Sequence, residues 1–345
     1  MNVALTEHLI VDEFLRDPMQ SELLSLAFES GLLDQLASTD FIEHRNLCLP
    51  SSVDKAGADF FIASLVHSGV LERSSSGDSI GLSARFRKAL PFRDLLEVKL
   101  SLARLVAADF SQHRVLDFLA GDDAFFRESR LFELFDYSRC HEITPQNCMA
   151  TSRWMQLTTT LTRYESLTIL DRYRFDQHKL WVDVGGNSGE LAAQVVARHR
   201  SLHATVFDLP VVCEVGQRHL RSHPDRSRIH FHAGDFLADA IPRDVDLITC
   251  KSLLHDWPIA HVNAILQQAF DSLLPGGRLV IFEREQCDDV AKRFCFGMLP
   301  VLMFFRSYRP PEIYQTMLAR LGFGEITYEQ VMLDWPFAII TAAKP

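Results

Sequence analysis

The chain has 345 residues, more than one typical domain, and 47% of them are hydrophobic, which is enough to bury two sizeable cores. Its formal net charge of −10 argues against a nucleic-acid or anionic-membrane partner, because phosphate binding needs clustered Lys and Arg. Seven cysteines, an odd number with no Cys-x-x-Cys pair, indicate reduced thiols and a cytoplasmic location. We expect neither a signal peptide nor a membrane span, since no basic segment precedes an apolar core and no apolar run reaches about 18 residues.

The first region, residues 1–95, has a helical pattern followed by a hairpin. Apolar residues recur at helical spacing over 22–36, with a break at Gly31, and again over 56–70. A turn then separates two short apolar runs within 69–82, which predicts a small wing. Helices with a wing are typical of winged-helix domains. Because this region is acidic and presents no basic helix face, we predict a structural or dimerisation role rather than DNA binding.

Residues 96–175 form the second region, which is mainly helical and rich in aromatic side chains. We interpret it as a connector between the wing and the segment that follows. Most of its aromatic side chains are expected in a core, and a minority are expected, together with Met149, to line an acceptor pocket.

The third region, residues 176–345, alternates strand and helix patterns, which predicts a doubly wound α/β domain with a parallel sheet. The predicted strands are residues 180–184, 202–208, 228–233, 245–251, 277–283, 322–326 and 338–341.

The first of these strands leads into a glycine turn and a helix, the usual start of a nucleotide-type site. A dinucleotide fingerprint counted from Gly185 requires glycine at its third and sixth positions, where this chain has Asn187 and Glu190. The carboxylate at the sixth position would repel a pyrophosphate. Asp183, Gly185 and Gly186 instead suit a cofactor that lacks phosphates and carries positive charge, such as S-adenosylmethionine.

Acidic residues follow the second and third strands as well. Asp208 lies 208 − 189 = 19 residues after Gly189, close to the ~20 expected for a carboxylate that binds ribose hydroxyls, and Leu209 follows it. Asp235 ends the third strand and is expected to accept a hydrogen bond from an adenine amino group. Phe236 is expected to cover the face of that ring.

The segment 251–257, Lys-Ser-Leu-Leu-His-Asp-Trp, follows the fourth strand. It resembles the motif of the class I S-adenosylmethionine-dependent small-molecule O-methyltransferases, which include plant caffeate and flavonoid enzymes, bacterial phenazine and polyketide enzymes, and acetylserotonin O-methyltransferase. The resemblance covers almost the whole chain. It implies a Rossmann-like domain of seven strands with an antiparallel edge, an N-terminal winged-helix dimerisation domain and a homodimer. It also implies a cofactor role for Lys251 and a general-base role for His255.

The proposed chemistry requires a base, because a neutral hydroxyl is a poor nucleophile and a histidine can remove its proton near neutral pH. Glu283 ends the neighbouring strand at the same sheet edge, so we expect it to orient the His255 imidazole. Asp256 completes the predicted catalytic set, and Trp257 is a candidate pocket residue.

Two departures from the family pattern affect the predicted site. The family usually has a glutamate as a second partner of the base, and Tyr308 stands at that place; Arg309 matches the family's arginine. Both are retained as candidate pocket residues. Asn187 stands where the family usually has the third glycine of the turn, and asparagine tolerates a left-handed backbone.

Four other functions remain open. S-methylation of a thioether carboxylate needs no base, and an arginine would hold the acceptor; the candidates are Arg139, Arg153, Arg306 and Arg309. C-methylation of an α-keto acid would use His255 and Asp256 as iron ligands, but no histidine follows His261, so we predict no metal. The third alternative is a reaction other than methyl transfer. The fourth is a non-catalytic winged-helix regulator that binds S-adenosylmethionine. Methylation of a hydroxyl on a small molecule is the function we expect.

Overall fold

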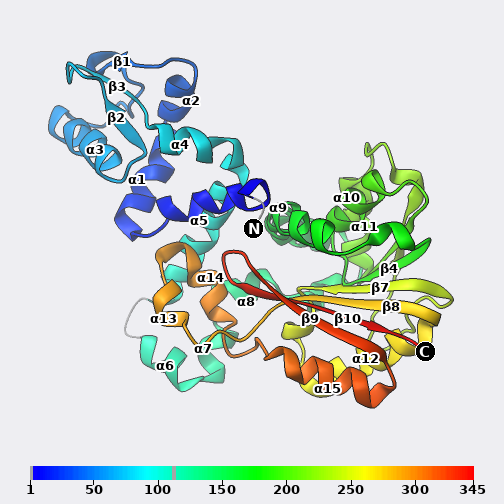
Figure 1. Cartoon of the computed structure of the whole chain (residues 1–345). Coiled ribbons are helices and arrows are strands. Elements are labelled where there is room, and N and C mark those ends of the chain that lie inside the picture. The colour runs from blue at the N-terminus through cyan, green and yellow to red at the C-terminus, as the bar shows by residue number, and fades with distance from the viewer. Residues whose placement is uncertain (1–2, 111–113) are drawn as a thin grey trace. The chain divides into compact units, whose positions relative to one another are not determined.

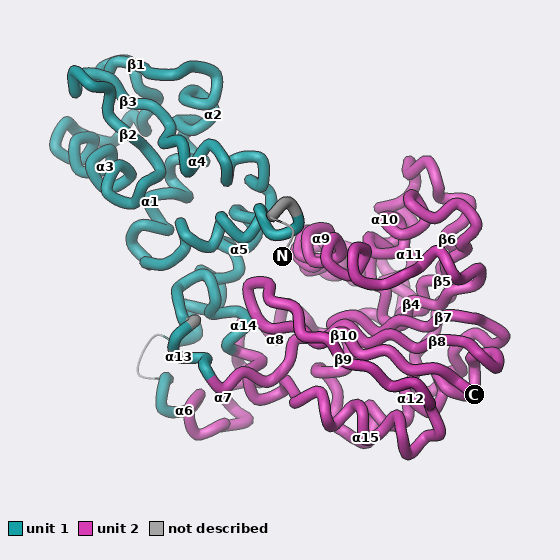
Figure 2. Tube along the Cα trace, in the orientation of Figure 1, with its two compact units in different colours: residues 1–116, 289–302 teal, residues 117–288, 303–345 magenta. Residues whose placement is uncertain are grey.

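A computed structural model describes residues 3–110 and 114–345. The chain forms two compact units, one made of residues 1–116 and 289–302 and the other of residues 117–288 and 303–345 (Figure 2). The predicted division at 95 and 175 therefore differs from the compact units. The predicted connector is divided between them, and a segment from late in the sequence completes the first unit. A prediction that divides the chain into consecutive segments cannot assign a late segment, here residues 289–302, to the unit formed by the N-terminal residues.

The first unit consists of short helices and a small antiparallel sheet. Its strands are β1 (Ile42–Glu43), β2 (Leu71–Arg73) and β3 (Ser79–Leu82), in the order β1-β3-β2. Its α-helices are α1 (Pro18–Glu29), α2 (Leu32–Ala37), α3 (Lys55–His67), α4 (Ala84–Ala89), α5 (Arg93–Ala107), α13 (Val290–Arg293) and α14 (Leu299–Met303). Its 3-10 helices are η1 (Val3–Phe14), η2 (His44–Asn46), η3 (Leu90–Phe92), η4 (Ala108–Phe110) and η9 (Phe296–Met298). The predicted wing is the β2–β3 hairpin, and the predicted helix break falls at Gly31, whose φ is 76°.

The second unit contains a seven-stranded sheet in the order β6-β5-β4-β7-β8-β10-β9 (Figure 1). Its strands are β4 (Leu180–Val184), β5 (His203–Asp208), β6 (Ile229–Ala233), β7 (Val245–Lys251), β8 (Leu273–Arg284), β9 (Gly324–Met332) and β10 (Pro336–Ala343). Strands β4 to β8 are parallel, and β10 is antiparallel to both β8 and β9. The predicted α/β fold with an antiparallel edge is confirmed.

One strand begins earlier than predicted. Leu273 of β8 pairs with Val245 of β7, the register then shifts, and Arg278 pairs with Leu247. The turn that was expected to precede the strand, residues 274–277, therefore forms an irregularity inside it. Gly276 adopts a φ of 79°, which a glycine reaches without strain, so the strand continues beyond the turn.

Helices cover both faces of the sheet, as a mainly parallel sheet requires. Helices α9, α10 and α11 lie on one face, and α12 and α15 lie on the other (Figure 1). Their bounds are α9 (Pro145–Arg172), α10 (Glu190–Arg198), α11 (Pro210–His219), α12 (Ile259–Ser272) and α15 (Pro311–Leu321). The remaining helices are α6 (Val115–Ala120), α7 (Asp123–Arg127), α8 (Arg130–Leu134), η5 (Tyr137–Cys140), η6 (Phe175–Gln177), η7 (Arg226–Arg228) and η8 (Leu254–Asp256). Among the described residues, none of the helices has the length and apolar character needed to cross a bilayer.

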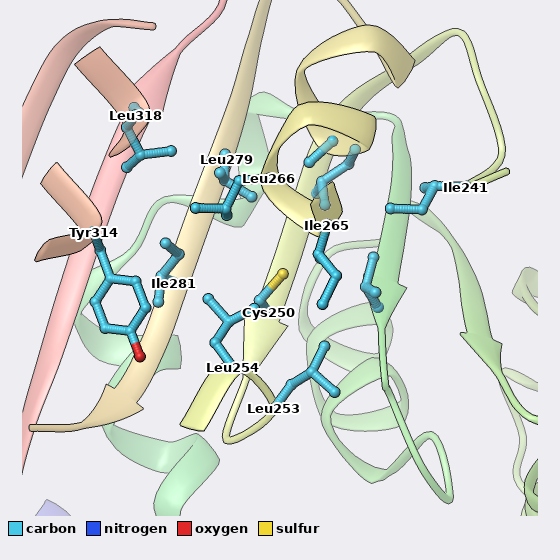
Figure 3. Close-up of a cluster of buried hydrophobic side chains, with 14 of the residues drawn as sticks. Ile241, Cys250, Leu253, Leu254, Ile265, Leu266, Leu279, Ile281, Tyr314 and Leu318 are labelled. Carbon is cyan, nitrogen blue, oxygen red and sulfur yellow. The ribbon is translucent and has the colours of Figure 1, made fainter. Parts of the chain in front are cut away.

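Apolar side chains fill the space between the sheet and each helical layer. Ile248, Ile281 and Leu318 belong to the core under α12 and α15, shown in Figure 3. Trp181 and Val206 belong to the core under α9 and α10. Because both faces of the central strands are buried in this way, the polar residues that follow these strands are held at the carboxyl edge of a rigid sheet.

Candidate active site

A cavity of ≈320 Å³ lies at this carboxyl edge, entirely within the second unit. The turn after β4, the ends of β5 and β7, helix α9 and η5 all contribute to its wall. Its lining residues are Tyr137, Ser138, His141, Trp154, Thr158, Thr162, Asp183, Gly185, Gly186, Asn187, Leu191, Asp208, Leu209, Val212, Asp235, Phe236, Lys251, Ser252, Leu253, Asp256 and Trp257. Every residue predicted to bind the cofactor is therefore part of this wall.

The glycine turn requires its two glycines for steric reasons. A Cβ on Gly185, whose φ is 65°, would lie 2.7 Å from Leu253, and a Cβ on Gly186 would lie 2.7 Å from the Asp183 carboxylate. Asn187 follows at a φ of 56°, in the left-handed region that asparagine tolerates. The turn thus brings its backbone close to the cavity while larger residues are excluded from its tightest positions.

Two carboxylates beside the turn, the buried Asp183 and the partly buried Asp208, accept hydrogen bonds from neutral donors. Asp183 accepts one from the Thr249 hydroxyl at 2.5 Å, and burial raises its pKa to about 7. Asp208 accepts from the backbone N–H groups of Asn187 and Leu209, each at 2.8 Å, and burial raises its pKa to about 6. Both carboxylates would be more readily ionised beside a positively charged ligand.

Lys251 lines the cavity, but its ammonium group is held by α9. Its Nζ lies 2.5 Å from Glu165 Oε2 and 3.3 Å from the Thr162 hydroxyl. Glu165 also accepts from Arg284 at 2.6 Å, and although burial opposes ionisation, the two cations lower the pKa of Glu165 to about 2. The Lys251 charge is therefore neutralised inside the protein.

Asp235, the third predicted acidic residue, and its neighbour Phe236 make different kinds of contact. Asp235 accepts from the Leu237 N–H at 2.9 Å, so its carboxylate caps a turn while lining the cavity. Phe236 packs edge-to-face against Trp257, with ring centroids 5.1 Å apart. Trp257, predicted as an acceptor-pocket residue, lines this cavity beside Phe236.

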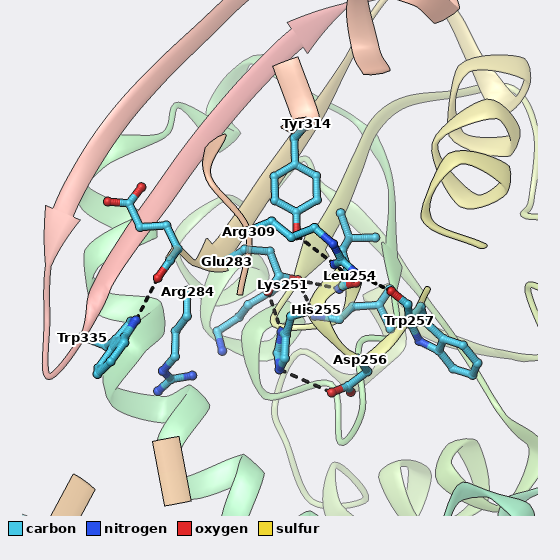
Figure 4. A network of polar contacts seen from close by, with 12 residues as sticks. Lys251, Leu254, His255, Asp256, Trp257, Glu283, Arg284, Arg309, Tyr314 and Trp335 are labelled. Carbon is cyan, nitrogen blue, oxygen red and sulfur yellow. Dashed lines mark hydrogen bonds and ion pairs between the residues drawn. The ribbon is translucent and has the colours of Figure 1, made fainter. Parts of the chain in front are cut away.

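His255 and Glu283 form a fixed pair at the end of β7 and β8 (Figure 4). Glu283 is fully buried; one of its oxygens accepts from the Leu253 and Leu254 N–H groups at 2.5 and 2.6 Å. The other lies 2.7 Å from His255 Nδ1. This carboxylate therefore holds both the loop and the imidazole, as expected from its place on the neighbouring strand, and makes Nδ1 the protonated nitrogen.

A second carboxylate faces the other imidazole nitrogen. Asp256 Oδ1 lies 3.4 Å from His255 Nε2, and Asp256 Oδ2 accepts a hydrogen bond from the Tyr137 hydroxyl at 3.0 Å. Burial opposes protonation of His255, but the charges of Asp256 and Glu283 outweigh it and raise the pKa of the imidazole above its usual value. Burial likewise raises the pKa of Asp256.

Three other residues predicted to line the acceptor pocket are not part of this cavity wall. Arg309 donates to the Leu254 carbonyl at 2.7 Å and to the Trp257 carbonyl, so it braces the backbone around His255 (Figure 4). Met149 is 57% exposed on α9 and is not part of the cavity wall. Tyr308, at the place of the family's glutamate, is buried with its ring 5.3 Å from that of His255.

Helix α9 contributes residues that the sequence analysis missed. The Thr159 hydroxyl donates to Ser188 at 2.7 Å and the Thr158 hydroxyl contacts Asn187 at 3.4 Å, which ties the helix to the glycine turn. Thr158, Thr162 and Glu165 recur at helical spacing. This polar stripe beside the helix's buried apolar residues is the signal that points to a role at the site.

The described residues, 3–110 and 114–345, contain no cluster of three or more His, Cys, Asp or Glu side chains arranged to hold a metal ion. The adjacent His255 and Asp256 are thus without a third ligand of these types in that part of the chain.

A doubly wound sheet with a glycine turn, a carboxylate-lined cavity and a histidine–glutamate pair defines a class I methyltransferase-type domain. The profile of the O-methyltransferase domain family matches residues 121–324, more than half of the chain, and the chain belongs to this family.

Relatives of known name match about half of the chain. It is 30% identical to acetylserotonin O-methyltransferase of Bos taurus over 52% of this chain and 54% of that protein. It is 28% identical to the N,N-dimethyltransferase OxyT of Streptomyces rimosus over 54% of this chain and 55% of that one. The chain thus spans about half the length of these relatives. Since the two names differ in the methyl acceptor, relatedness alone does not fix the acceptor atom.

Solved structures match the fold over almost the whole chain. The mitomycin 7-O-methyltransferase MmcR aligns with a TM-score of 0.70 at 16% identity, covering 94% of each chain. Human N-acetylserotonin methyltransferase in complex with S-adenosylmethionine aligns with a TM-score of 0.66 at 18% identity, covering 95% of this chain and 94% of that one. These alignments establish the shared fold.

Proposed function

We propose that this protein transfers a methyl group from S-adenosylmethionine to a hydroxyl group of a small, neutral, largely apolar acceptor, with His255 as the general base. The observation that carries the proposal is the buried His255–Glu283 pair, 2.7 Å apart, next to a cavity lined by carboxylates. Family membership supports the reaction class.

The cavity fits the cofactor by charge. Asp183 and Asp208 accept only neutral donors among the contacts described, and the Lys251 ammonium is paired with Glu165. A ligand with sulfonium and ammonium groups would stabilise both carboxylates, whereas a pyrophosphate would be repelled. Asp208 would hold ribose hydroxyls, the glycine turn would admit the ligand close to the backbone, and Phe236 with Trp257 would pack against the adenine ring. The bound cofactor would supply an electrophilic methyl group.

The chain's own residues supply the proton chemistry. Neutral His255 accepts the proton of the acceptor hydroxyl at Nε2, while Nδ1–H remains bonded to Glu283. The imidazolium that forms is stabilised by the Glu283 carboxylate, which is already in place and needs no rearrangement. The rigid edge of the sheet fixes the relative position of base and cofactor cavity.

The surroundings of His255 favour a neutral acceptor over the anionic alternatives. Its imidazole packs edge-to-face against Phe304 at 5.7 Å, and Phe304 packs against Phe132 at 5.2 Å. Three of the four arginines considered for an acceptor carboxylate have partners within the protein, and the fourth is solvent-exposed. Arg309 braces the loop backbone, Arg306 donates to the Leu119 carbonyl, Arg139 pairs with Asp136, and Arg153 is exposed. A thioether carboxylate or α-keto acid would therefore lack a cationic partner among these side chains.

The oligomeric state, the location and the partners are further parts of this proposal, and the oligomeric state follows from the family resemblance. We infer a homodimer formed through residues 1–95 and a cytoplasmic location, with no nucleic-acid partner, in line with the net charge of −10. Light scattering of the purified chain after size-exclusion chromatography measures its mass directly. A monomer at micromolar concentration would contradict the homodimer.

The central test measures release of S-adenosylhomocysteine with three kinds of acceptor: a panel of neutral phenols, an α-keto acid and a thioether carboxylate. We expect turnover of a phenol, and a loss on the order of 10²-fold or more in His255→Ala. His203→Ala, which removes an exposed histidine at the far end of β5, is the matched control and should keep full activity. Turnover of the thioether alone, with the His255→Ala rate retained, would overturn the proposal.

A further inference from the structure

Tyr137 links the wall of the cofactor cavity to the acid–base residues. It begins η5, its ring packs edge-to-face against Trp154 at 5.7 Å, and its hydroxyl donates to Asp256 at 3.0 Å. The two residues are 119 positions apart in the sequence, so no local pattern brings them together. Both line the cavity.

Asp256 is shared between two partners. Its Oδ2 accepts from Tyr137, while its Oδ1 faces His255 Nε2 at the long distance of 3.4 Å. Nε2 is the atom that must take the proton of the acceptor, because Nδ1 is bonded to Glu283 at 2.7 Å. A carboxylate that moved fully onto Nε2 would accept a hydrogen bond from this nitrogen once it is protonated, and would so stabilise the imidazolium at the expense of the neutral base.

We propose that Tyr137 is a positioning residue that holds the Asp256 carboxylate back from His255 Nε2 and so keeps this nitrogen available to the acceptor hydroxyl. The inference rests on the proposed general-base function of His255. Tyr137 acts through Asp256, while Glu283 alone holds the imidazole, at Nδ1.

The charged groups around His255 and Asp256 set the direction of the expected pH effect. Glu283 and Asp256 face the imidazole, Arg284 acts on it through space, and Arg309 acts on Asp256. Removing the Tyr137 hydroxyl concentrates the Asp256 charge on Oδ1, which stabilises the imidazolium. The pKa of His255 then rises further, less neutral base is present at a given pH, and activity at acidic pH falls more than activity at alkaline pH.

The test compares Tyr137→Phe, Asp256→Asn and the double variant with the wild type. Tyr328→Phe is the matched control, because it removes a tyrosine hydroxyl that donates to the Glu285 carboxylate at 2.9 Å. With the phenol that the wild type turns over fastest, we expect kcat of Tyr137→Phe near neutrality to fall about tenfold and to recover at higher pH. The dissociation constant of S-adenosylhomocysteine should change by less than about threefold. In the Asp256→Asn background, Tyr137→Phe should have little further effect.

A readout that needs no acceptor separates this inference from the proposed function. The titration of the His255 imidazole, followed by NMR with labelled histidine and identified by its loss in His255→Ala, should move to higher pH in Tyr137→Phe and stay unchanged in Tyr328→Phe. An unchanged titration in Tyr137→Phe overturns the inference, even if the enzyme is active on phenols. So does a loss of S-adenosylhomocysteine affinity that equals the loss of kcat. An imidazole shift without turnover of any hydroxyl acceptor would instead contradict the proposed function.

Discussion

The two halves of the site both depend on carboxylates at the same sheet edge, but the partners of these carboxylates differ. On the glycine-turn side, Asp183 and Asp208 accept from a hydroxyl and from backbone N–H groups, and burial raises their pKa values to about 7 and about 6. On the histidine side, Glu283 accepts two N–H groups and the imidazole of His255. A carboxylate satisfied by the protein belongs to the fixed machinery, and one that lacks a positive partner marks where a cationic ligand belongs.

Among these variants, substitution of Glu283, the carboxylate bonded to His255, should have the largest effect. In Glu283→Gln, an amide N–H₂ group placed opposite Nδ1–H would set two donors against each other, so the imidazole loses its orientation and its counter-charge. We expect kcat to fall on the order of 10³-fold and the folded state to lose about 1–3 kcal/mol. Steady-state kinetics and thermal unfolding measure the two effects. A kcat within a few-fold of the wild type would mean that Glu283 only supports the loop.

Removing a carboxylate that is bonded only to neutral donors should act on binding instead. Asp208→Asn leaves one oxygen, which can accept from only one of the two backbone N–H groups, and removes the charge, so the dissociation constant of S-adenosylmethionine should rise by at least about tenfold. Calorimetric titration measures it. Asp176→Asn, which removes an exposed carboxylate paired with Arg174, is the control and should leave binding unchanged. Equal effects in both variants would contradict the assignment.

The raised pKa values of Asp183 and Asp208 predict how cofactor binding and stability depend on pH. The carboxylates of Asp208 and Asp183, with pKa values of about 6 and about 7, are ionised only above these values, so affinity for the cationic cofactor should rise with pH through this window. The expected change is up to about tenfold per pH unit for each group. Without cofactor the effect on folding is opposite: a carboxyl whose folded pKa is raised stabilises the fold fully below its usual pKa of 3.8, and this contribution is lost as pH rises from there to the folded values. Binding and unfolding measured across the window test both signs.

The smallest effect is expected from the helix behind the turn. Thr159→Val keeps the shape of the side chain but removes the hydroxyl that donates to Ser188 at 2.7 Å. The turn loses one anchor, and cofactor affinity should fall by about threefold to fivefold with kcat unchanged. Thr327→Val, which removes a hydroxyl from the exposed Thr327–Thr341 contact, is the matched control. A loss of kcat without a loss of affinity would contradict a role at the turn.

The features predicted from sequence are those that local patterns and strand order determine. β4 and β7 have the predicted bounds, and the contact between His255 and Glu283 follows from two parallel strands that end at one edge. The cavity position of Asp208 follows in the same way. These features need only strand periodicity and the rule that the carboxyl ends of parallel strands meet at one edge.

The features that sequence reasoning missed depend on contacts between distant segments. Tyr137 and Glu165 reach the end of β7 from the helical region, 119 and 86 positions away in the sequence. Arg309 is drawn to backbone carbonyls that no side-chain pattern reveals, and Met149 lies on the exposed face of α9. Such contacts are set by tertiary packing, so composition and periodicity do not contain them.

The segment 289–302 has a consequence for how the chain folds during synthesis. Within the first unit, the Gly297 N–H donates to the Leu15 carbonyl at 2.8 Å and the Phe296 N–H donates to the Arg16 carbonyl at 3.3 Å. A Cβ on Gly297 would lie 2.9 Å from Leu15, so the two segments are closely packed. The ribosome delivers the N-terminal residues first, yet this unit lacks part of its interior until residue 302 has emerged. The unit that starts to fold first is thus among the last to be completed, and its nascent form must wait with apolar surface exposed while most of the sheet is still being made.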